Sequence, residues 1–524
     1  MPKMIIATLL LFIPTIAFPD THYVSKSGRD SGTCTLASQC LTINYGITQM
    51  SAGDTLTVGD GTYNEQIHNN IPNGSAGAYT IIKSTNNQGA VINGTGLGQH
   101  NFGIDLYSKS YVQIDGFKVV MDISGPEAGG IIVSGYCHHI KFFRCSVSGV
   151  SITEWNSGAI NVAGPGPHDI LFEECWSWGG GRYKFTAFSV DNVIFRRCVA
   201  RHDYHPWNQC AGFVSYNSKN TQFQNCIILD SGENYPSETN GLLYGGYWFE
   251  NNNLSDTPTV IRGGIVLNVQ AHGGIFDPYN SGSKTISDTV IWGGNSGYHG
   301  NTQVGSPNIL LNNMTIGNIW GTYAENQAKS SGTGVYYGSG SVTSLITKNS
   351  IIANNNSYGV ADYMISNYNV VYGNRSNYGG SEHTPSQGAN DCTTLNPRIS
   401  SLLYLPRIET GSTLKTLGEG GGQIGAQIIY QHGTAGTLYG ETGYDTLTTV
   451  PLWPFPNEAL IKSQMGSYNN IGPSGARGFA AAGKQLNGVD NITLTSYIWE
   501  YLGNIMPSNI YTKRPNPPQI LGIN

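Results

Sequence analysis

Charge is scarce in this chain of 524 residues. Only 11% of the residues are Asp, Glu, Lys or Arg, against about 25% in an average soluble domain. The 27 basic and 33 acidic residues give a formal net charge of −6. That balance argues against a nucleic-acid-binding protein, which would carry a basic patch. Disorder is also disfavoured, because 39% of the residues are hydrophobic and 11% are aromatic. A polar surface built from Gly, Asn, Ser, Thr and Tyr is typical of an extracellular all-β protein.

Long apolar runs are missing beyond the N-terminus. Lys3 and the mostly apolar residues 4–16 have the pattern of a secretory signal peptide, which we expect to be removed near residues 17–20. A short buried N-terminal element is the alternative. This apolar run is too short to span a bilayer, and no later stretch reaches the roughly 18 residues that a transmembrane helix needs. We therefore assign residues 1–19 to a signal peptide and expect a secreted or periplasmic protein without a transmembrane segment.

The nine cysteines contain no CxxC motif, which argues against a zinc site. Cys34 and Cys40 flank a small polar loop and are predicted to form a disulfide. Four further cysteines each follow a phenylalanine by three residues. These pairs are Phe142 and Cys145, Phe172 and Cys175, Phe195 and Cys198, and Phe223 and Cys226. The recurrence indicates a repeat, and we predict that the four cysteines form a ladder in the core.

The same frame continues in both directions, at residues 112–117, 260–265, 286–290, 309–314 and 345–350. Each unit has a short apolar run, a two-residue polar corner, a second apolar run, a Gly-rich loop and a third run. Helical repeats are excluded, because periodic segments of ten or more residues are absent. Asn suits the corners because it tolerates the left-handed conformation. Units that bury their apolar side only by stacking form a solenoid, and the frame favours a parallel β-helix over a β-sandwich.

A family resemblance agrees with this fold. Residues 21–30, 40–43 and 51–65, continued by 73–83 and 91–94, resemble the N-terminal capping region of right-handed parallel β-helix proteins of the pectate-lyase superfamily. The later segments are similar to the chondroitinase B and alginate-lyase branch. The resemblance implies an all-β, right-handed parallel β-helix over residues 20–428. The resemblance predicts the reaction only weakly, because this superfamily contains lyases, hydrolases, epimerases and non-catalytic adhesins.

Residues 429–524 have a different character. Short helical patterns follow residues 453–458 and occupy residues 491–503, and several prolines then exclude regular structure. We predict that this C-terminal extension caps the open C-terminal end of the solenoid. A separate binding module is the alternative.

The strongest local signal lies in three loops that follow the cysteine-containing strands, at residues 175–184, 201–207 and 230–238. They occupy the same rung position, so we expect them to stack about 4.8 Å apart per rung. They concentrate ionic and aromatic side chains, a combination that suits sugar rings and uronate carboxylates. The predicted substrate-binding residues are Trp176, Trp178, Arg182, Tyr183, His202 and Trp207.

A lyase would abstract the C5 proton of a uronic acid and neutralise the adjacent carboxylate. We predict Lys184 or His205 as the base and Arg201 or Arg182 as the carboxylate partner, so that the catalytic set is Lys184, Arg201 and His205. Calcium is a possible cofactor, with Asp203, Asp230 and Glu233 as its ligands. The partner is then a polysaccharide containing uronic acids.

Other interpretations stay open. The histidines are also explained by backbone capping and the tryptophans by loop packing. We predict that Arg196 and Arg197 are solvated residues at the edge of a coil. A hydrolase would need two carboxylates across the bond, for which Asp203 with Asp230 is the adjacent-rung candidate. The chain has no clear copy of the catalytic motifs of chondroitinase B, alginate lyases or polygalacturonases. The main alternative to a polysaccharide lyase is therefore a non-catalytic exported β-helix that binds glycan or a protein partner.

Overall fold

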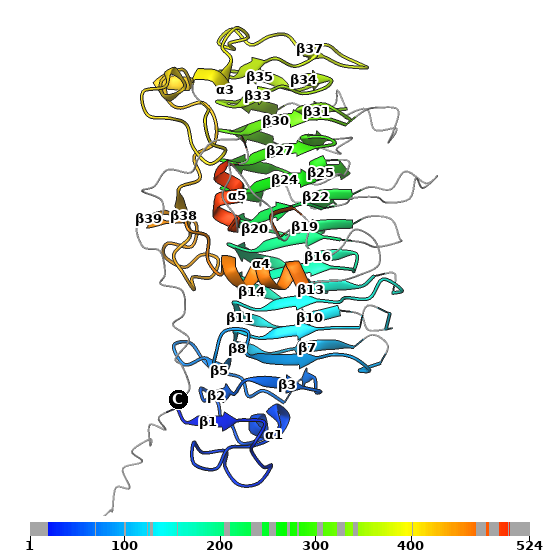
Figure 1. Ribbon diagram of the computed structural model, residues 1–524, viewed down its shortest axis with the longest axis vertical. Helices are drawn as coiled ribbons and strands as arrows, with labels where there is room; N and C mark the ends of the chain where they lie inside the picture. Colours follow the sequence, from blue (N-terminus) through cyan, green and yellow to red (C-terminus); the bar gives the residue numbers. More distant parts are fainter. Residues whose placement is uncertain are drawn as a thin grey trace, which may run out of the picture.

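The computed structural model describes residues 19–68, 70–98, 101–122, 124–125, 129–154, 156–203, 210–231, 244–250, 258–269, 273–279, 282–300, 308–321, 331–338, 344–400, 402–467, 478–480, 492–500 and 502. Within them, the chain winds into a stack of coils, and each coil contributes one strand to each of three parallel sheets (Figure 1). Strands pair only with the equivalent strands of neighbouring coils, in order along the chain. This topology is the predicted right-handed parallel β-helix, whose handedness follows the rule for crossovers between parallel strands.

Sheet I has 13 strands: β1 (Thr21–Val24), β2 (Thr55–Val58), β5 (Thr80–Ser84), β8 (Ser110–Asp115), β11 (His138–Phe143), β14 (His168–Glu173), β17 (Asp191–Arg196), β20 (Gln222–Gln224), β23 (Thr259–Arg262), β26 (Lys284–Ser287), β29 (Asn308–Asn312), β32 (Ser344–Lys348) and β35 (Ile365–Asn367). Sheet II has 12: β3 (Gly61–Tyr63), β6 (Ala90–Asn93), β9 (Lys118–Val120), β12 (Ser146–Ser148), β15 (Trp176–Gly179), β18 (Val199–His202), β21 (Ile227–Leu229), β24 (Ile265–Val269), β27 (Val290–Gly294), β30 (Thr315–Ile319), β33 (Ile351–Ala353) and β36 (Val370–Tyr372).

Sheet III also has 12 strands: β4 (Ile67–His68), β7 (Phe102–Tyr107), β10 (Gly129–Ser134), β13 (Gly158–Ala163), β16 (Tyr183–Phe188), β19 (Cys210–Tyr216), β22 (Tyr244–Glu250), β25 (Gly273–Tyr279), β28 (Tyr298–Gly300), β31 (Val335–Tyr337), β34 (Tyr358–Asp362) and β37 (Ser376–Gly379). The remaining described elements are α1 (Ile43–Thr48), α3 (Pro397–Ser400), α4 (Glu458–Ser467), α5 (Leu494–Glu500), the short 3₁₀ helices η1 (Thr413–Lys415), η2 (Glu419–Gly421) and η3 (Gly478–Ala480), and the hairpin strands β38 (Tyr430–His432) and β39 (Leu447–Pro451).

The corner between sheets I and II explains the repeated sequence frame. Its first residue adopts a left-handed conformation, for example at Asn225 (φ 52°), Asn313 (φ 53°) and Asn349 (φ 52°), as the asparagines predicted. Its second residue turns inward, and this is where the four repeated cysteines lie fully buried. The predicted cysteine ladder is therefore confirmed.

The phenylalanines of the frame form a second ladder in the core. Phe142 stacks on Phe172 with ring centroids 4.7 Å apart, Phe172 stacks on Phe195 at 5.7 Å, and Phe195 stacks on Phe223 at 5.5 Å. Because each coil places the same ring type at the same register, every coil packs its apolar interior against its two neighbours.

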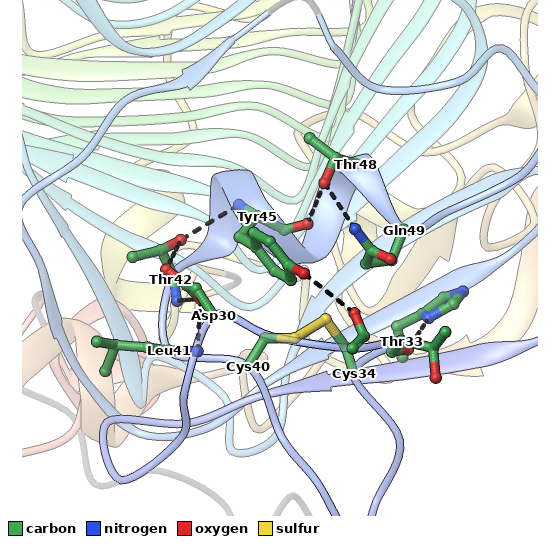
Figure 2. The surroundings of a disulfide bond; sticks show 11 residues. Asp30, Thr33, Cys34, Cys40, Leu41, Thr42, Tyr45, Thr48 and Gln49 are labelled. Atoms are coloured by element: carbon green, nitrogen blue, oxygen red, sulfur yellow. Dashed lines mark hydrogen bonds between the residues drawn. A yellow bond between two sulfur atoms is a disulfide. The ribbon is translucent and has the colours of Figure 1, made fainter.

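The N-terminal end of the stack is closed by α1 and the loop before it (Figure 1). The predicted disulfide joins Cys34 to Cys40 across a separation of six residues, and both cysteines are fully buried. Figure 2 shows how the surrounding loop is held: Asp30 accepts hydrogen bonds from the backbone of Leu41 and Thr42, and the hydroxyl of Tyr45 donates to the carbonyl of Gly32 at 3.2 Å. The loop is therefore fixed to α1 by both the disulfide and hydrogen bonds.

The C-terminal extension lies differently from the prediction. It runs back along the side of the stack, where α4 and α5 lie beside strands of sheet II (Figure 1). Its apolar residues, including Met465 and Trp499, share one buried cluster with Trp176 and Trp292 of sheet II. The described residues of the extension thus cover the apolar outer face of sheet II, and not the open C-terminal end as predicted, because covering that face removes apolar surface from water.

A second correction concerns Arg196 and Arg197, which we predicted to be solvated. Both are buried, at 0% and 1% exposure, beneath residues 432–446 of the extension. Arg196 donates to the carbonyl oxygens of Thr434 (2.9 Å) and Tyr444 (2.9 Å), and both arginines pair with Glu173. The sequence of the solenoid alone contains no sign of this cover, which comes from more than 230 residues away.

Among the described residues, no helix is both long and apolar enough to cross a membrane. The predicted signal peptide, residues 1–19, falls almost entirely outside the described part of the chain, so the localisation stays a prediction.

Candidate functional site

Sheet III is the part of the solenoid on which we place the candidate site. The extension buries outer side chains of sheet II, among them Trp176 and Leu267, and of sheet I, where Leu438 packs on Leu171 and Ile194. The connections that enter sheet III from sheet II include long ones, at residues 149–157, 203–209 and 230–243. Connections are where functional side chains gather on a rigid scaffold.

Aromatic side chains line the outer face of sheet III. Trp248 and Phe276 are in edge-to-face contact at 5.1 Å, and Phe276 contacts His299 at 4.9 Å. His299 in turn contacts Tyr336 at 5.0 Å, so the row crosses four adjacent strands. Beside this row, partly buried Tyr183 and Tyr216 pack on the cluster that contains Trp248 and Phe276. The four rings of this row are buried, at 0 to 7% exposure, so among these rings only the partly exposed Tyr183 and Tyr216 can offer a ring to a sugar from solvent.

Arg182 supplies a cation at the edge of this row. Its guanidinium lies 4.7 Å from the centre of the Tyr183 ring and donates to the Asn156 side-chain oxygen at 2.5 Å. Glu250 accepts a hydrogen bond from Trp248 Nε1 at 2.9 Å. Burial raises the pKa of Glu250, while the hydrogen bond from Trp248 and the charge of Arg182 lower it. We define Arg182, Tyr183, Tyr216, Trp248 and Glu250 as the Arg182 group.

Lys184 points into the solenoid, whereas the Arg182 group lies on the outer face of the same sheet. Its ammonium donates to the carbonyl oxygens of Gly179 (2.7 Å), Gly180 and Gly181 (3.4 Å), and the side chain is fully buried. Burial lowers the pKa of Lys184 to about 7, while the negative charge of Asp203 acts in the opposite direction. The three carbonyls belong to the short turn that leads into Arg182.

The register shows that a lysine is unusual at this position. Tyr183 pairs with Ala211 and Phe185 with Phe213, which places Lys184 opposite Gly212. The next strands carry Gly246 and Gly274 there, and a Cβ at either would lie 2.4 Å from a neighbouring atom. Lys184 thus replaces a small residue in a tightly packed column, with its long side chain directed into the corner between sheets II and III.

Arg201, His202 and Asp203 surround the same corner. Arg201 Nε lies 3.1 Å from an oxygen of Asp203, and both side chains are 0% exposed. Asp203 accepts from the backbone N–H of Gly179 at 2.6 Å, and His202 Nε2 lies 2.9 Å from the carbonyl oxygen of Gly181. Lys184 and these three residues therefore form one buried polar cluster around Gly179–Gly181, which we call the corner cluster.

The predicted stacking is confirmed for the described beginning of the first two loops, since Trp178 pairs with Arg201 and Gly179 with His202 in adjacent strands. The structure places Trp176 and Trp178 under the extension, where they are 0% and 2% exposed, and Trp176 Nε1 donates to Gln464 of α4 at 2.9 Å. Packing accounts for both rings, so we do not carry them into the candidate site. Arg201 likewise donates to the carbonyl oxygen of Met465 in α4, at 3.1 Å.

The carboxylates predicted to bind calcium are held by protein donors. Asp230 accepts from Asn268 (2.9 Å), from the Tyr497 hydroxyl (3.0 Å) and from the backbone N–H of Phe479 (3.1 Å). Asp203 is engaged by Gly179 and Arg201, so the two do not form a hydrolytic pair facing a bond. Within the described ranges, no group of three or more His, Cys, Asp or Glu side chains is placed to hold a metal ion. The described residues thus do not fit a calcium site.

Three predicted residues, His205, Trp207 and Glu233, lie outside the described residues. Of the rest, the structure brings Lys184, Arg201, His202 and Asp203 together, and it places Arg182 and Tyr183 on the outer face. Trp248 and Glu250 were missed. Their signal was present, because a tryptophan and a glutamate two positions apart share one face of a strand, and charge is rare in this chain.

Comparisons with known proteins show similarity in the fold alone. No family model matches the chain, and no curated protein matches it. Among solved structures, it is similar to pectate lyase Pel9A, with 13% identity, a TM-score of 0.45 and coverage of 79% of this chain and 98% of that one. A rhamnogalacturonan lyase has 13% identity and a TM-score of 0.41, covering 82% and 97% of the two chains. An alginate lyase from Paenibacillus sp. str. FPU-7 has 11% identity and a TM-score of 0.35, covering 56% and 93%.

The strand pairings themselves establish the class: the protein is a parallel β-helix with an aromatic outer face on one of its three sheets. The names of the similar structures describe those proteins alone, and the activity of this chain is a separate question.

Proposed function

We propose that the protein is an exported, carbohydrate-active enzyme of the polysaccharide lyase type, which cleaves a uronic-acid polysaccharide by β-elimination. The observation that carries this proposal is the Arg182 group. It combines a partly exposed guanidinium, aromatic rings and a carboxylate on the outer face of sheet III. A guanidinium pairs with a carboxylate through two parallel hydrogen bonds, which is the recognition that a uronate requires.

In the proposed reaction, Arg182 binds the uronate carboxylate and stabilises the negative charge that develops when C5 loses its proton. The base takes that proton, a double bond forms between C4 and C5, and the C4–O bond breaks as the leaving oxygen gains a proton. Tyr183 and Tyr216, which are partly exposed, provide surfaces for the neighbouring sugar rings.

We redistribute the predicted roles according to the contacts of these side chains. Arg201 is engaged with Asp203 and Met465 inside the corner, so we assign the carboxylate to Arg182. Lys184 donates to three carbonyl oxygens, so we assign it to holding the turn at Gly179–Gly181 and propose His205 as the base. His205 belongs to the connection between β18 and β19, and β19 pairs with the strand of Tyr183.

The second candidate function is a non-catalytic, glycan-binding β-helix. One observation favours it: the ionic residues of the corner cluster are buried and engaged by protein partners, as in a structural network. The aromatic face of sheet III would then bind glycan without chemistry.

The experiment that separates the two is a panel of pectate, alginate and glycosaminoglycans, followed by the ultraviolet absorbance of unsaturated products. Calcium and chelator arms in the same assay test the cofactor that the sequence suggested. We expect Arg182→Ala and His205→Ala each to lower the rate at least 100-fold, because each removes a transition-state interaction. Arg375→Ala, at an exposed arginine near the far end of the stack, is the matched control and should leave the rate unchanged.

Absence of unsaturated products on every uronan, with glycan binding that is lost on Tyr216→Ala, would establish the second function instead. Export is tested separately: N-terminal sequencing of the secreted protein should begin near residue 20.

A further inference from the structure

A line of rings and polar side chains crosses sheet I at the ends where its strands begin, on the corner that follows sheet III. Its members come from successive coils and are half-exposed. We define this corner strip as Tyr79, Tyr111, His138, His139, His168, Asp169, Asn192 and Asn220. It is separate from the Arg182 group, which lies on the outer face of sheet III.

Ring contacts connect one half of the corner strip. Tyr79 and Tyr111 are edge-to-face at 5.5 Å, and Tyr111 lies 4.5 Å from the ring of His139. His138 and His168, on adjacent strands, are stacked at 5.3 Å with an interplanar angle of 7°. The side chain of His139 is 30% exposed and that of His168 is 45% exposed. The strip therefore presents a continuous series of aromatic surfaces to solvent.

Hydrogen bonds connect the other half. Nδ1 of His168 lies 2.8 Å from a carboxylate oxygen of Asp169, whose other oxygen accepts from Asn192 at 2.9 Å. The side-chain oxygen of Asn192 accepts from Asn220 at 2.8 Å. Carboxylate and amide groups fixed in this way beside rings are suited to sugar hydroxyls, which both donate and accept hydrogen bonds.

The backbone shows that two of the rings occupy a disfavoured conformation. Tyr111 and His139 have φ of 54°, in the left-handed region. The same column of later coils holds Asp169 (φ 56°), Asn192 (φ 57°) and Asn220 (φ 53°). Asp, Asn and His are enriched in this region, whereas the ring of Tyr111 there is unusual and marks a candidate for function.

Exposed rings gather at the same corner. Tyr107 and Phe188 end strands of sheet III with 54% and 42% exposure, and Tyr136 lies between β10 and β11 with 77% exposure. Phe188 also contacts Tyr216 at 5.1 Å. Exposed apolar rings that are concentrated at one place mark an interaction surface.

We propose that the corner strip is a second carbohydrate-binding surface, which binds an extended, neutral polysaccharide. Its members recur once per coil, at the strand spacing of about 4.8 Å, which is close to the length of one sugar in an extended chain. A neutral ligand is favoured because the carboxylate of Asp169 would repel a uronate, while the ammonium of Lys141, which would attract one, is already engaged over the Tyr79 ring at 4.7 Å. Binding here does not rest on the enzymatic activity proposed above.

The test is affinity electrophoresis of the full chain in gels that contain soluble xylan, mixed-linkage β-glucan or galactomannan. The informative variant is Tyr111→Asn with His139→Asn, because Asn removes both rings and suits the left-handed backbone. We expect retardation by at least one of these polysaccharides and at least a tenfold loss of affinity in the double variant. The melting temperature should stay the same or rise, which a purely structural role for the rings would not allow.

Tyr430→Ala, at a 40% exposed tyrosine of the extension, is the matched aromatic control and should retain full affinity. Arg182→Ala should also retain it, which separates this surface from the proposed active site. The proposal is overturned if none of the three polysaccharides retards the protein, or if the double variant binds as tightly as the parent.

Discussion

Arg196 Nη1 donates to Glu173 Oε2 at 3.0 Å, and both side chains are shielded from solvent, at 0% and 3% exposure. Glu173 also pairs with Arg197 and accepts from the backbone N–H of Gly436 in the extension at 2.9 Å. One carboxylate therefore compensates two buried guanidinium groups and binds the covering segment. Because the charges of Glu173, Arg196 and Arg197 are shielded from water, the attachment of residues 432–446 depends on this ionic network.

The first prediction follows from removing that carboxylate. Glu173→Gln keeps the shape of the side chain but removes the paired carboxylate of Arg196 and leaves Arg197 with only its 3.6 Å contact to Glu174, so the free energy of unfolding should fall by about 3 kcal/mol or more. Asp445→Asn is the control, because its 3.7 Å contact with Arg262 is about one-third exposed and should contribute less than about 1 kcal/mol. Denaturant unfolding measures both, and equal losses in the two variants would contradict the network.

The second prediction concerns pH. Because burial lowers the pKa of Lys184 to about 7, the folded protein releases this proton near neutrality, while the unfolded chain holds it to about pH 10. Between these values the unfolded state binds more protons, so this residue makes stability rise with pH, by an amount on the order of a few kcal/mol. Below pH 7 both states are protonated and its contribution is constant.

Lys184→Met should therefore flatten the rise of unfolding free energy between pH 7 and pH 10. It should also lower stability at every pH, because the carbonyl oxygens of Gly179 and Gly181 lose their donor. Denaturant unfolding at several pH values measures this effect. The diagnostic quantity is the slope of the unfolding free energy against pH, and not its value at any one pH. Lys83→Met, at an exposed lysine of β5, is the control, and an equal slope in both variants would exclude this interpretation.

The third prediction concerns the N-terminal cap. Replacing both Cys34 and Cys40 by Ala releases a closed loop of only a few residues, for which the chain-entropy model gives a loss of about 2 kcal/mol. Because coils contact only their neighbours, we expect the loss to appear first as faster amide exchange in β1 and α1. Unchanged exchange there, or a change spread evenly along the solenoid, would show that the hydrogen bonds of Asp30 hold the loop without the disulfide.

The periodic part of the molecule was predictable because its cause is local. The corner asparagines, the cysteine ladder and the phenylalanine ladder each follow from which residue suits one position of a coil, and that choice repeats along the sequence. The same periodicity placed Trp178 beside Arg201 correctly. Lys184 was identified because it belongs to a concentration of charged residues in a chain where charge is rare. The sequence did not predict that its side chain points into the corner.

The parts that failed depend on contacts between distant segments. Arg196 looks like a solvated corner residue until Thr434 and Tyr444 cover it, and Trp176 looks like a sugar platform until α4 packs on it. The hydrophobic effect is non-directional, so a local sequence pattern does not predict which outer face of the solenoid an extension packs against. Glu250 was missed for a similar reason, since its neighbour Arg182 directly precedes β16, a strand of sheet III two coils earlier.

The last prediction concerns the thiols. Seven of the nine cysteines are free, and six of these are buried, whereas Cys392 is only partly buried. Burial raises the pKa of Cys175, Cys210 and Cys226, which suppresses the reactive thiolate. A thiol reagent such as Ellman's should therefore modify one thiol rapidly in the native protein and all seven after unfolding. Cys392→Ala should abolish the rapid phase. A second rapid thiol in that variant would mean that the corner of the solenoid opens, because the ladder cysteines become reachable only when neighbouring coils separate.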